Sequence, residues 1–490
     1  MKKFAQLFPV MKKLTILLLV AIPFVSSGQT GHKLDFKIKG LKDTTAYLGY
    51  FYGETTYLKD TAKVNSQGVF FFDGKERLPQ GVYFFVLNKM KMFEFVVAEQ
   101  QHFSLETSTE DYVANMKVQG DDDNRIFFEN MIFSTLRQKE AEPFLQVLKD
   151  STLKDDQKKE ARESFGKLSQ KVMAYQNDLI NSNPKTLTAR LLKMNKPIEI
   201  PDPPKKADGS IDSSFQLRYY RQHFFDNFDL ADEAMLRLPR PFYAEKVGEY
   251  LDKLFIQTPD SIMAAIDGLV QKAKANQETY KFLVYNCVLK YQQPKIMGLD
   301  EVFVRLNDKY YSSGAMDFWA PASFKKSLKD YADKMRPCLI GKTGANLIMQ
   351  DQNLQQKSMY DIKKKYTILY IFDPDCGHCR TESPKLVEFY NKDKVKFNLE
   401  VFAVSTDTSI LKMKNYIKEM KMTWITVNGP RSYVGEYNKF YMVDTTPQVF
   451  ILDDKKKIIA KGLPVDKLED FFTNYEKFQQ KKAPIKPKGT

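Results

Sequence analysis

One segment near the C-terminal end decides the fold of that part of the chain, and it reads Tyr370-Ile371-Phe372-Asp373-Pro374-Asp375-Cys376-Gly377-His378-Cys379. Its first three residues end a mostly apolar run, Thr367–Phe372, which is typical of a strand buried on both faces of a sheet. Helical spacing begins at Cys376 and continues to about residue 390. The segment therefore predicts an α/β unit with a C-x-x-C pair where the strand meets the helix.

The spacing of the two cysteines favours thiol-disulfide chemistry. Two thiols three residues apart on a first helical turn can close a disulfide with little movement of the backbone. Cys376 is predicted at the helix N-terminus, where free N–H groups and the helix dipole stabilise a thiolate, so it is the candidate nucleophile. Cys379 lies one turn further and is predicted to be more buried, as the resolving thiol that attacks the mixed disulfide.

Two other interpretations of the pair are weaker. A zinc half-site needs a second ligand pair, and the remaining cysteines, Cys287 and Cys338, are neither adjacent nor in a C-x-x-C, so no metal is predicted. A purely structural disulfide would close too short a loop to remove much chain entropy. Cys287 and Cys338 themselves are predicted to be unreactive packing residues, with a disulfide between them as the alternative.

Strands and helices alternate around the cysteine pair, from about residue 337 to residue 480. The predicted strands are Thr367–Phe372, Leu399–Ser405, Gln448–Asp453 and Lys457–Gly462. Helices are predicted from Cys376 to about Tyr390, at Ile410–Met420 and at Val465–Gln479. This β-α-β-α-β-β-α order predicts a mixed sheet covered by helices.

Residues 337–480 resemble the thioredoxin fold, specifically the TlpA/ResA-like thiol-disulfide oxidoreductases of the bacterial envelope. The resemblance rests on the strand Ile368–Phe372, the Cys376–Cys379 motif, Pro384 in the next helix, Thr446-Pro447 before the strand Gln448–Leu452, and the opening stretch 340–347. It implies that residues 340–347 form an extra hairpin. It also implies a cis Pro447, which places the Thr446 backbone beside Cys376, where it pairs with an extended substrate and blocks metal binding.

The same resemblance implies further residue roles. The buried Asp of thioredoxin is replaced here by Tyr370. Glu382 matches a Glu that this type carries three residues after the second Cys, and is expected to exchange a proton with Cys379; an exposed helix carboxylate is the alternative. The family's Trp before the first Cys is absent, and Asp375, which stands there, should oppose thiolate formation slightly.

His378 is expected to tune the redox potential of the pair. An imidazole beside the thiolate favours the reduced form and raises the potential. The dipeptide Gly377-His378 also occurs in protein disulfide isomerase, whose potential is about −180 mV against about −270 mV for thioredoxin. The dipeptide alone does not fix the direction of transfer, because neighbouring carboxylates act as well.

The rest of the chain is predicted to hold two more domains, consistent with about three domains at roughly 150 residues each in a chain of 490. Residues 29–118 show alternating apolar and polar positions, which predicts an antiparallel β sandwich or barrel. Residues 119–336 show helical spacing and predict an α-helical domain. Both resemble domains of unknown function that accompany such thioredoxin modules. Residues 481–490 form a basic tail.

The N-terminus predicts export. Residues 1–28 combine a basic start, a short apolar run at Leu14–Val25 and small residues before Gln29, as a cleaved signal peptide does. The apolar run is shorter than the roughly 20 residues that a stable membrane span needs. Cleavage after residue 28 would remove four Lys, and so four positive charges, from a chain whose formal charge is +14. The expected location is the periplasm or cell envelope, where disulfides persist.

The sequence thus predicts an envelope thiol-disulfide oxidoreductase that reduces protein disulfides. The resemblance implies protein thiol or disulfide substrates, a membrane electron donor and no cofactor; neither nucleic acid nor a stable metal is expected. One alternative is a disulfide oxidase or isomerase of the same fold. Another is a surface binding protein with an accessory redox domain. Peroxiredoxin activity is disfavoured, because a close C-x-x-C replaces the single peroxidatic Cys.

Overall fold

The computed structural model describes residues 30–482. The predicted signal peptide and nearly all of the basic tail lie outside the described residues. The described chain divides into two compact units. The first comprises the described residues up to Gly49, Leu58–Pro79 and Phe84–Leu168, and the second comprises Tyr50–Tyr57, Gln80–Tyr83 and everything from Ser169 on.

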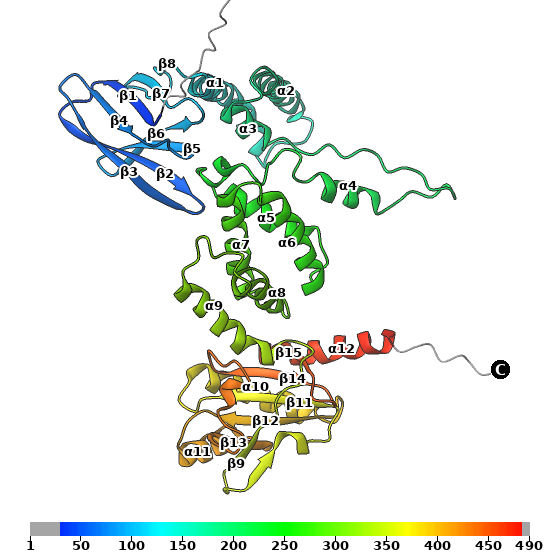
Figure 1. Ribbon diagram of the computed structural model, residues 1–490. Coiled ribbons are helices and arrows are strands. Elements are labelled where there is room, and N and C mark those ends of the chain that lie inside the picture. Colours follow the sequence, from blue (N-terminus) through cyan, green and yellow to red (C-terminus); the bar gives the residue numbers. More distant parts are fainter. Residues whose placement is uncertain (1–29, 483–490) are drawn as a thin grey trace, which may run out of the picture. The chain divides into compact units, whose positions relative to one another are not determined.

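The N-terminal strands form two four-stranded sheets, with strand orders β4-β1-β7-β8 and β3-β2-β5-β6 (blue in Figure 1). Their bounds are β1 (His32–Lys39), β2 (Thr44–Tyr52), β3 (Thr55–Val64), β4 (Val69–Gly74), β5 (Gly81–Leu87), β6 (Met90–Val97), β7 (His102–Ser108) and β8 (Lys117–Gln119). The predicted β domain is confirmed, although β1 pairs in parallel with β7 while it pairs antiparallel with β4.

Buried phenylalanines make the core of the first unit. Phe36 stacks on Phe70 with ring centroids 5.0 Å apart, and Phe85 lies 5.4 Å from Phe70. The alternation that predicted β1 is the alternation that buries Leu34, Phe36 and Ile38. β3 was not predicted, because its side chains are almost all exposed and give no apolar period.

Helices follow the strands, as the sequence predicts. They are α1 (Asp122–Lys149), α2 (Lys159–Ser182), α3 (Leu187–Lys193), α4 (Phe215–His223), α5 (Phe242–Lys253), α6 (Pro259–Ala273), α7 (Gln277–Gln292), α8 (Asp300–Leu306) and α9 (Ala322–Met335). Thr258 is the N-cap residue of α6 with Pro259 in the first turn, as expected from their order in the sequence. No helix among the described residues is both long enough and apolar enough to cross a membrane.

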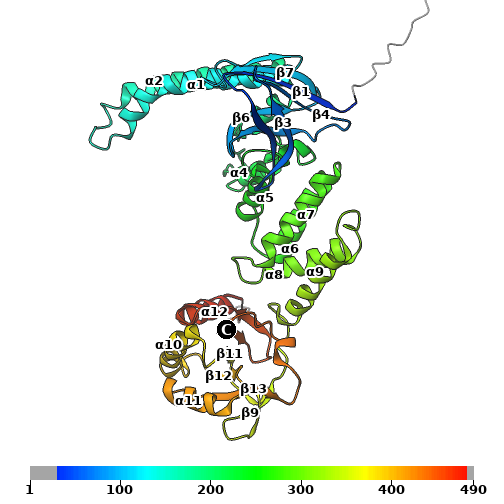
Figure 2. The ribbon, with the colours of Figure 1, turned by 90° about the vertical axis from the view of Figure 1, so that its left-hand side faces the viewer.

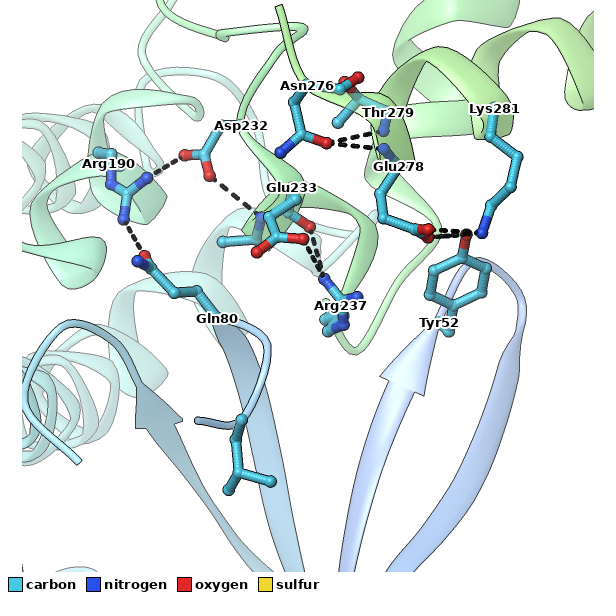
Figure 3. Close-up of polar contacts among 12 residues, drawn as sticks. Tyr52, Gln80, Arg190, Asp232, Glu233, Arg237, Asn276, Glu278, Thr279 and Lys281 are labelled. Atoms are coloured by element: carbon cyan, nitrogen blue, oxygen red, sulfur yellow. Dashed lines mark hydrogen bonds and ion pairs between the residues drawn. The ribbon is translucent and has the colours of Figure 1, made fainter. Parts of the chain in front are cut away.

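Two short β segments, residues 50–57 and 80–83, are bound to the helices of the second unit. Gly53 N–H donates to the Leu236 carbonyl over 2.9 Å, and Val82 N–H donates to the Arg237 carbonyl over 2.8 Å. Side chains extend these contacts: Tyr52 donates to Glu278 over 3.2 Å (Figure 3). These hydrogen bonds explain why the strand tips group with the helices.

The C-terminal part contains a seven-stranded sheet in the order β10-β9-β13-β12-β11-β14-β15. Its strands are β9 (Ile348–Asp351), β10 (Gln356–Ser358), β11 (Tyr366–Phe372), β12 (Leu399–Ser405), β13 (Ile425–Ser432), β14 (Gln448–Leu452) and β15 (Ile458–Lys461). The central strand β11 is parallel to β12 and antiparallel to β14. This mixed sheet and its helices confirm the predicted thioredoxin fold.

Helices α10 (Gly377–Asp393), α11 (Ile410–Met420) and α12 (Leu468–Lys482) contribute Leu386, Tyr416 and Phe472 to one core on a single face of this sheet. Figure 2 shows the three helices beside strands β11 and β12. Two details differ from the expectation. The extra hairpin is formed by β9 and β10, just after residues 340–347, and β13 was missed because Asn428-Gly429-Pro430 resembles a turn.

Candidate active site

Cys376 lies where β11 ends and α10 begins, as the sequence predicts. A tight turn leads into the helix: Cys376 N–H donates to the Asp373 carbonyl over 3.1 Å, and Asp375 N–H donates to the Asp373 carboxylate over 2.8 Å. Cys376 is the N-cap residue of α10, with the extended backbone that this position requires. Its thiol is half-buried, whereas the neighbouring Gly377 and His378 are exposed.

Backbone N–H groups of the first helical turn favour the thiolate form of Cys376. The pKa of Cys376 is lowered from its ordinary value, first by the N–H of Cys379 and next by the Thr446 side chain, with a smaller effect of the His378 N–H. The N–H groups of Cys379 and His378 belong to the first turn of α10, where N–H groups have no carbonyl partner within the helix. The geometry therefore makes Cys376 the more acidic and more accessible thiol of the pair.

Cys379 has the opposite environment. Its side chain is fully buried in the core of the domain, and its sulfur accepts a hydrogen bond from the Asp373 N–H over 3.4 Å. Burial raises the pKa of Cys379 to about 11. At neutral pH, Cys376 is therefore the more readily ionised thiol of the pair, and Cys379 stays protonated.

The Thr446–Pro447 peptide bond is cis, as the family resemblance implies. The Cys376 thiol donates to the Thr446 carbonyl over 3.4 Å, so the loop before β14 lies directly against this thiol. The structure thus brings together Cys376, Cys379 and Thr446, which are far apart in sequence. An extended peptide laid along residue 446 would reach the Cys376 sulfur.

A lysine neutralises the carboxylate beside the nucleophile. Lys412, in the first turn of α11, donates to Asp375 over 2.5 Å and to Asp407 over 3.0 Å. The two carboxylates raise the pKa of Lys412, with Asp375 having the larger effect. The sequence predicted that Asp375 opposes thiolate formation, and the structure adds a cation that offsets this repulsion. Lys412 was missed because only the fold brings it to residue 375.

Glu382 is half-buried one turn beyond Cys379. One carboxylate oxygen accepts from Lys385 over 2.6 Å, and the other accepts from the Val465 N–H over 3.3 Å. Glu382 therefore joins α10 to the segment before α12. Proton exchange with Cys379 stays a prediction for this residue, whose two oxygens already have other partners.

A buried chain of hydroxyl groups lies behind the cysteine pair. The hydroxyls of Tyr370 and Ser383 are 2.8 Å apart, and those of Ser383 and Tyr416 are also 2.8 Å apart. All three side chains are inaccessible to solvent. Of the three, only Tyr370 could be singled out from the sequence, because Ser383 and Tyr416 lie on separate helices and show no motif.

Within residues 30–482, the other two cysteines form no second redox pair. Cys287 and Cys338 are both buried and unpaired, so the alternative disulfide between them is absent. Burial raises the pKa of both thiols, which agrees with the predicted unreactive role. Within residues 30–482 no cluster of three or more His, Cys, Asp or Glu side chains is arranged to hold a metal ion.

A cavity of about 650 Å³ opens among the helices of the second unit. Arg190, Lys193 and Lys272 line it together with acidic side chains. Arg190 is already paired with Asp232 and donates to Gln80 over 2.9 Å, as Figure 3 shows. Because this cavity mixes both charges and its arginine is engaged, it indicates no particular ligand.

Comparison with known proteins finds three family models along the chain and a thioredoxin-like relative of its C-terminal part. The AhpC/TSA family model matches residues 340–461. Models of two domains of unknown function, DUF4369 and DUF5106, match residues 32–127 and 173–334. A tryparedoxin of Trypanosoma brucei brucei is 30% identical over 115 residues, which are 23% of this chain and 78% of that protein.

Solved structures give similar matches to the C-terminal part. A domain of a possible thiol-disulfide isomerase from Cytophaga hutchinsonii is 32% identical, with a TM-score of 0.27, over 29% of this chain and 97% of that one. The thioredoxin domain of a thiol-disulfide oxidoreductase from Bacteroides vulgatus is 29% identical, with a TM-score of 0.26, over 28% and 96% of the two chains.

Proposed function

Since residues 340–461 make this chain a member of the thioredoxin-like thiol-disulfide oxidoreductases, we propose that it reduces protein disulfides through Cys376 and Cys379. One observation carries the proposal. Two thiols on one helical turn have opposite environments, an accessible thiol with a lowered pKa and a buried thiol with a raised pKa. This asymmetry supports attack by Cys376 and release by Cys379.

The proposed reaction proceeds in two exchanges. The Cys376 thiolate attacks one sulfur of a substrate disulfide, an S–S bond forms between protein and substrate, and the other substrate sulfur leaves as a thiolate. Cys379 then attacks the Cys376 sulfur and releases the second substrate sulfur. The substrate gains two electrons and two protons, and the protein is left with a Cys376–Cys379 disulfide. A dithiol donor must reduce this disulfide again; by family resemblance that donor is a membrane protein.

The decisive experiment traps the covalent intermediate. In Cys379→Ala the second exchange is blocked, so substrate proteins should accumulate as adducts that dithiothreitol releases and mass spectrometry identifies. Cys376→Ser/Cys379→Ala, which lacks the nucleophile, is the matched control. Absence of adducts in the single variant, together with unchanged insulin reduction by Cys376→Ser, would rule the proposal out.

The direction of transfer is a separate part of the proposal. A reductase should have a potential well below about −200 mV in a glutathione buffer, whereas a value near −120 mV would indicate an oxidase. The accessible imidazole of His378 is the feature that favours the second outcome. Equilibration of the full chain with glutathione, followed by separation of oxidised and reduced protein, distinguishes the two directions.

We also propose that the protein acts in the periplasm or cell envelope. The support is the signal-like composition of residues 1–28, with its basic start and short apolar run. N-terminal sequencing of the protein from fractionated cells tests this location. A mature chain that begins at Gln29 in the envelope fraction is expected, and an intact N-terminus in the cytoplasmic fraction would contradict it.

A further inference from the structure

The burial of Cys379 creates a problem for the proposed second exchange. This thiol must lose its proton to attack the mixed disulfide at Cys376, but its side chain has no exposed surface. Its sulfur accepts the Asp373 N–H over 3.4 Å, and hydrogen bonds with the Thr446 side chain and with Cys376 act on it as well, yet burial still keeps its pKa raised. Removing a charge-forming group from water disfavours the charged form strongly. A thiolate at this position therefore needs polar groups inside the core.

The core supplies such groups as a continuous chain. Tyr370 comes from β11, Ser383 from α10 and Tyr416 from α11, and their hydroxyls are joined by two contacts of 2.8 Å. Tyr370 and Cys379 belong to the same buried cluster, and the Tyr416 phenol interacts electrostatically with both thiols of the pair. A hydroxyl can donate or accept by rotation, so one chain can serve the thiol and the thiolate alike.

The phenols of Tyr370 and Tyr416 stay neutral while Cys379 loses its proton. Burial is the main cause that raises the pKa of Tyr416, to about 12, and it raises the pKa of Tyr370 further. The phenols therefore offer O–H dipoles at every pH where disulfide exchange runs. Hydrogen bonds in a chain also polarise one another in a medium of low dielectric constant.

Few charged groups other than these hydroxyl residues can influence the ionisation of Cys379. The titratable and charged groups around Cys379 include Asp373 and Cys376 just before α10, Glu382 and Arg380 on α10, Tyr370 on β11 and Tyr416 on α11. The Arg380 guanidinium lies over the Tyr416 ring. Glu382 is engaged by Lys385 and the Val465 N–H. Arg380 is paired with Glu419 over 2.7 Å at the surface.

We propose that the hydroxyl chain of Tyr370, Ser383 and Tyr416 supports the loss of the Cys379 proton when this thiol attacks the mixed disulfide. The inference rests on the proposed exchange reaction. In that step the Cys379–Cys376 bond forms and the Cys376–substrate bond breaks. The electron pair leaves on the substrate sulfur, which takes up one proton for the one that Cys379 releases. The three hydroxyl residues are positioning residues that stabilise the developing thiolate through their dipoles.

The test separates the two exchanges in the reduced full-length protein. Ellman's reagent first reacts with Cys376 and releases one thionitrobenzoate, and Cys379 then releases the second from the mixed disulfide. Tyr370→Phe and Tyr416→Phe keep the rings but remove the hydroxyls. We expect the second release to slow about tenfold at neutral pH and its pH profile to move to higher pH. The first release should be unchanged in Tyr370→Phe and should change less than the second in Tyr416→Phe.

A matched control distinguishes this role from packing. Tyr390→Phe removes another hydroxyl from the same core, one that donates to Glu400 over 2.7 Å at the far end of α10. Tyr390→Phe should leave both releases and their pH profiles unchanged. If Tyr370→Phe and Tyr416→Phe also leave the second release unchanged, the inference is overturned. If the wild-type protein shows no second release at all, the proposed exchange reaction itself fails.

Discussion

Replacement of His378 by proline would test which part of this residue tunes the nucleophile. His378 contributes two groups near Cys376, an exposed imidazole and a backbone N–H that helps to lower the pKa of Cys376. Proline removes both, and alanine removes only the imidazole. Proline fits the first turn of a helix, where no intrahelical hydrogen bond is lost, so both variants should fold.

The expected loss of thiolate stability in His378→Pro follows from the missing N–H donor at residue 378. A hydrogen bond to a charged group contributes about 1.5–3 kcal/mol. Cys376 is half-buried, so water competes for its thiolate and the lower figure applies. About 1.4 kcal/mol corresponds to a factor of ten in an equilibrium and to about 30 mV in a two-electron couple. The Cys376 thiol should therefore be about tenfold less ionised in His378→Pro than in His378→Ala near neutral pH. The potential of His378→Pro should be about 30 mV more negative, since a weaker thiolate favours the disulfide.

Two measurements check this difference. The rate of iodoacetamide alkylation as a function of pH reports the thiolate fraction of Cys376, and equilibration with glutathione reports the potential. The difference between His378→Ala and wild type then isolates the imidazole. Equal alkylation profiles and equal potentials for His378→Pro and His378→Ala would refute the role assigned to the His378 N–H.

Three further predictions concern other parts of the chain. Lys412→Met should expose the nucleophile to the charge of Asp375 and slow its alkylation at neutral pH; Asp375→Asn in the same background should restore the rate, and a failure to restore it contradicts the ion-pair role. Asn124→Ala should destabilise β6 by about 2–4 kcal/mol in hydrogen exchange, because two buried backbone groups lose their partner. Cys287 and Cys338 should both react with iodoacetamide only after denaturation, and mass mapping that finds them joined would disprove this.

The position of Cys376 and Cys379 between a buried strand and a helix could be predicted from the sequence because its signals are local. An apolar run, a turn and a C-x-x-C lie within thirteen residues, Thr367–Cys379, and each signal acts over one strand or one helical turn. The residues that surround the pair were missed for the opposite reason. Tyr416 lies 33 positions from Ser383, and Lys412 lies 37 from Asp375. Such contacts depend on how α11 packs on the sheet, which no period within a single segment reveals.

The unequal acidity of the two thiols also decides how the reaction should respond to pH. The pKa of Cys376 is depressed, so the first exchange is fully active at a lower pH than an ordinary thiol allows and slows only as the pH falls through that lowered value. The pKa of Cys379 is about 11, so only about one Cys379 in 10⁴ is ionised at neutral pH and the second exchange should accelerate throughout the alkaline range.

Proximity compensates for this small ionised fraction. A well-oriented intramolecular group can reach an effective concentration of about 10⁵ M or more. Even when only about one thiol in 10⁴ is ionised, the effective concentration of the Cys379 thiolate is therefore far above that of a millimolar external thiol. Cys379 should therefore still resolve the mixed disulfide before free thiols can. Its removal should lengthen the life of the adduct by several orders of magnitude, and for that reason Cys379→Ala is a trap even in the presence of external thiol.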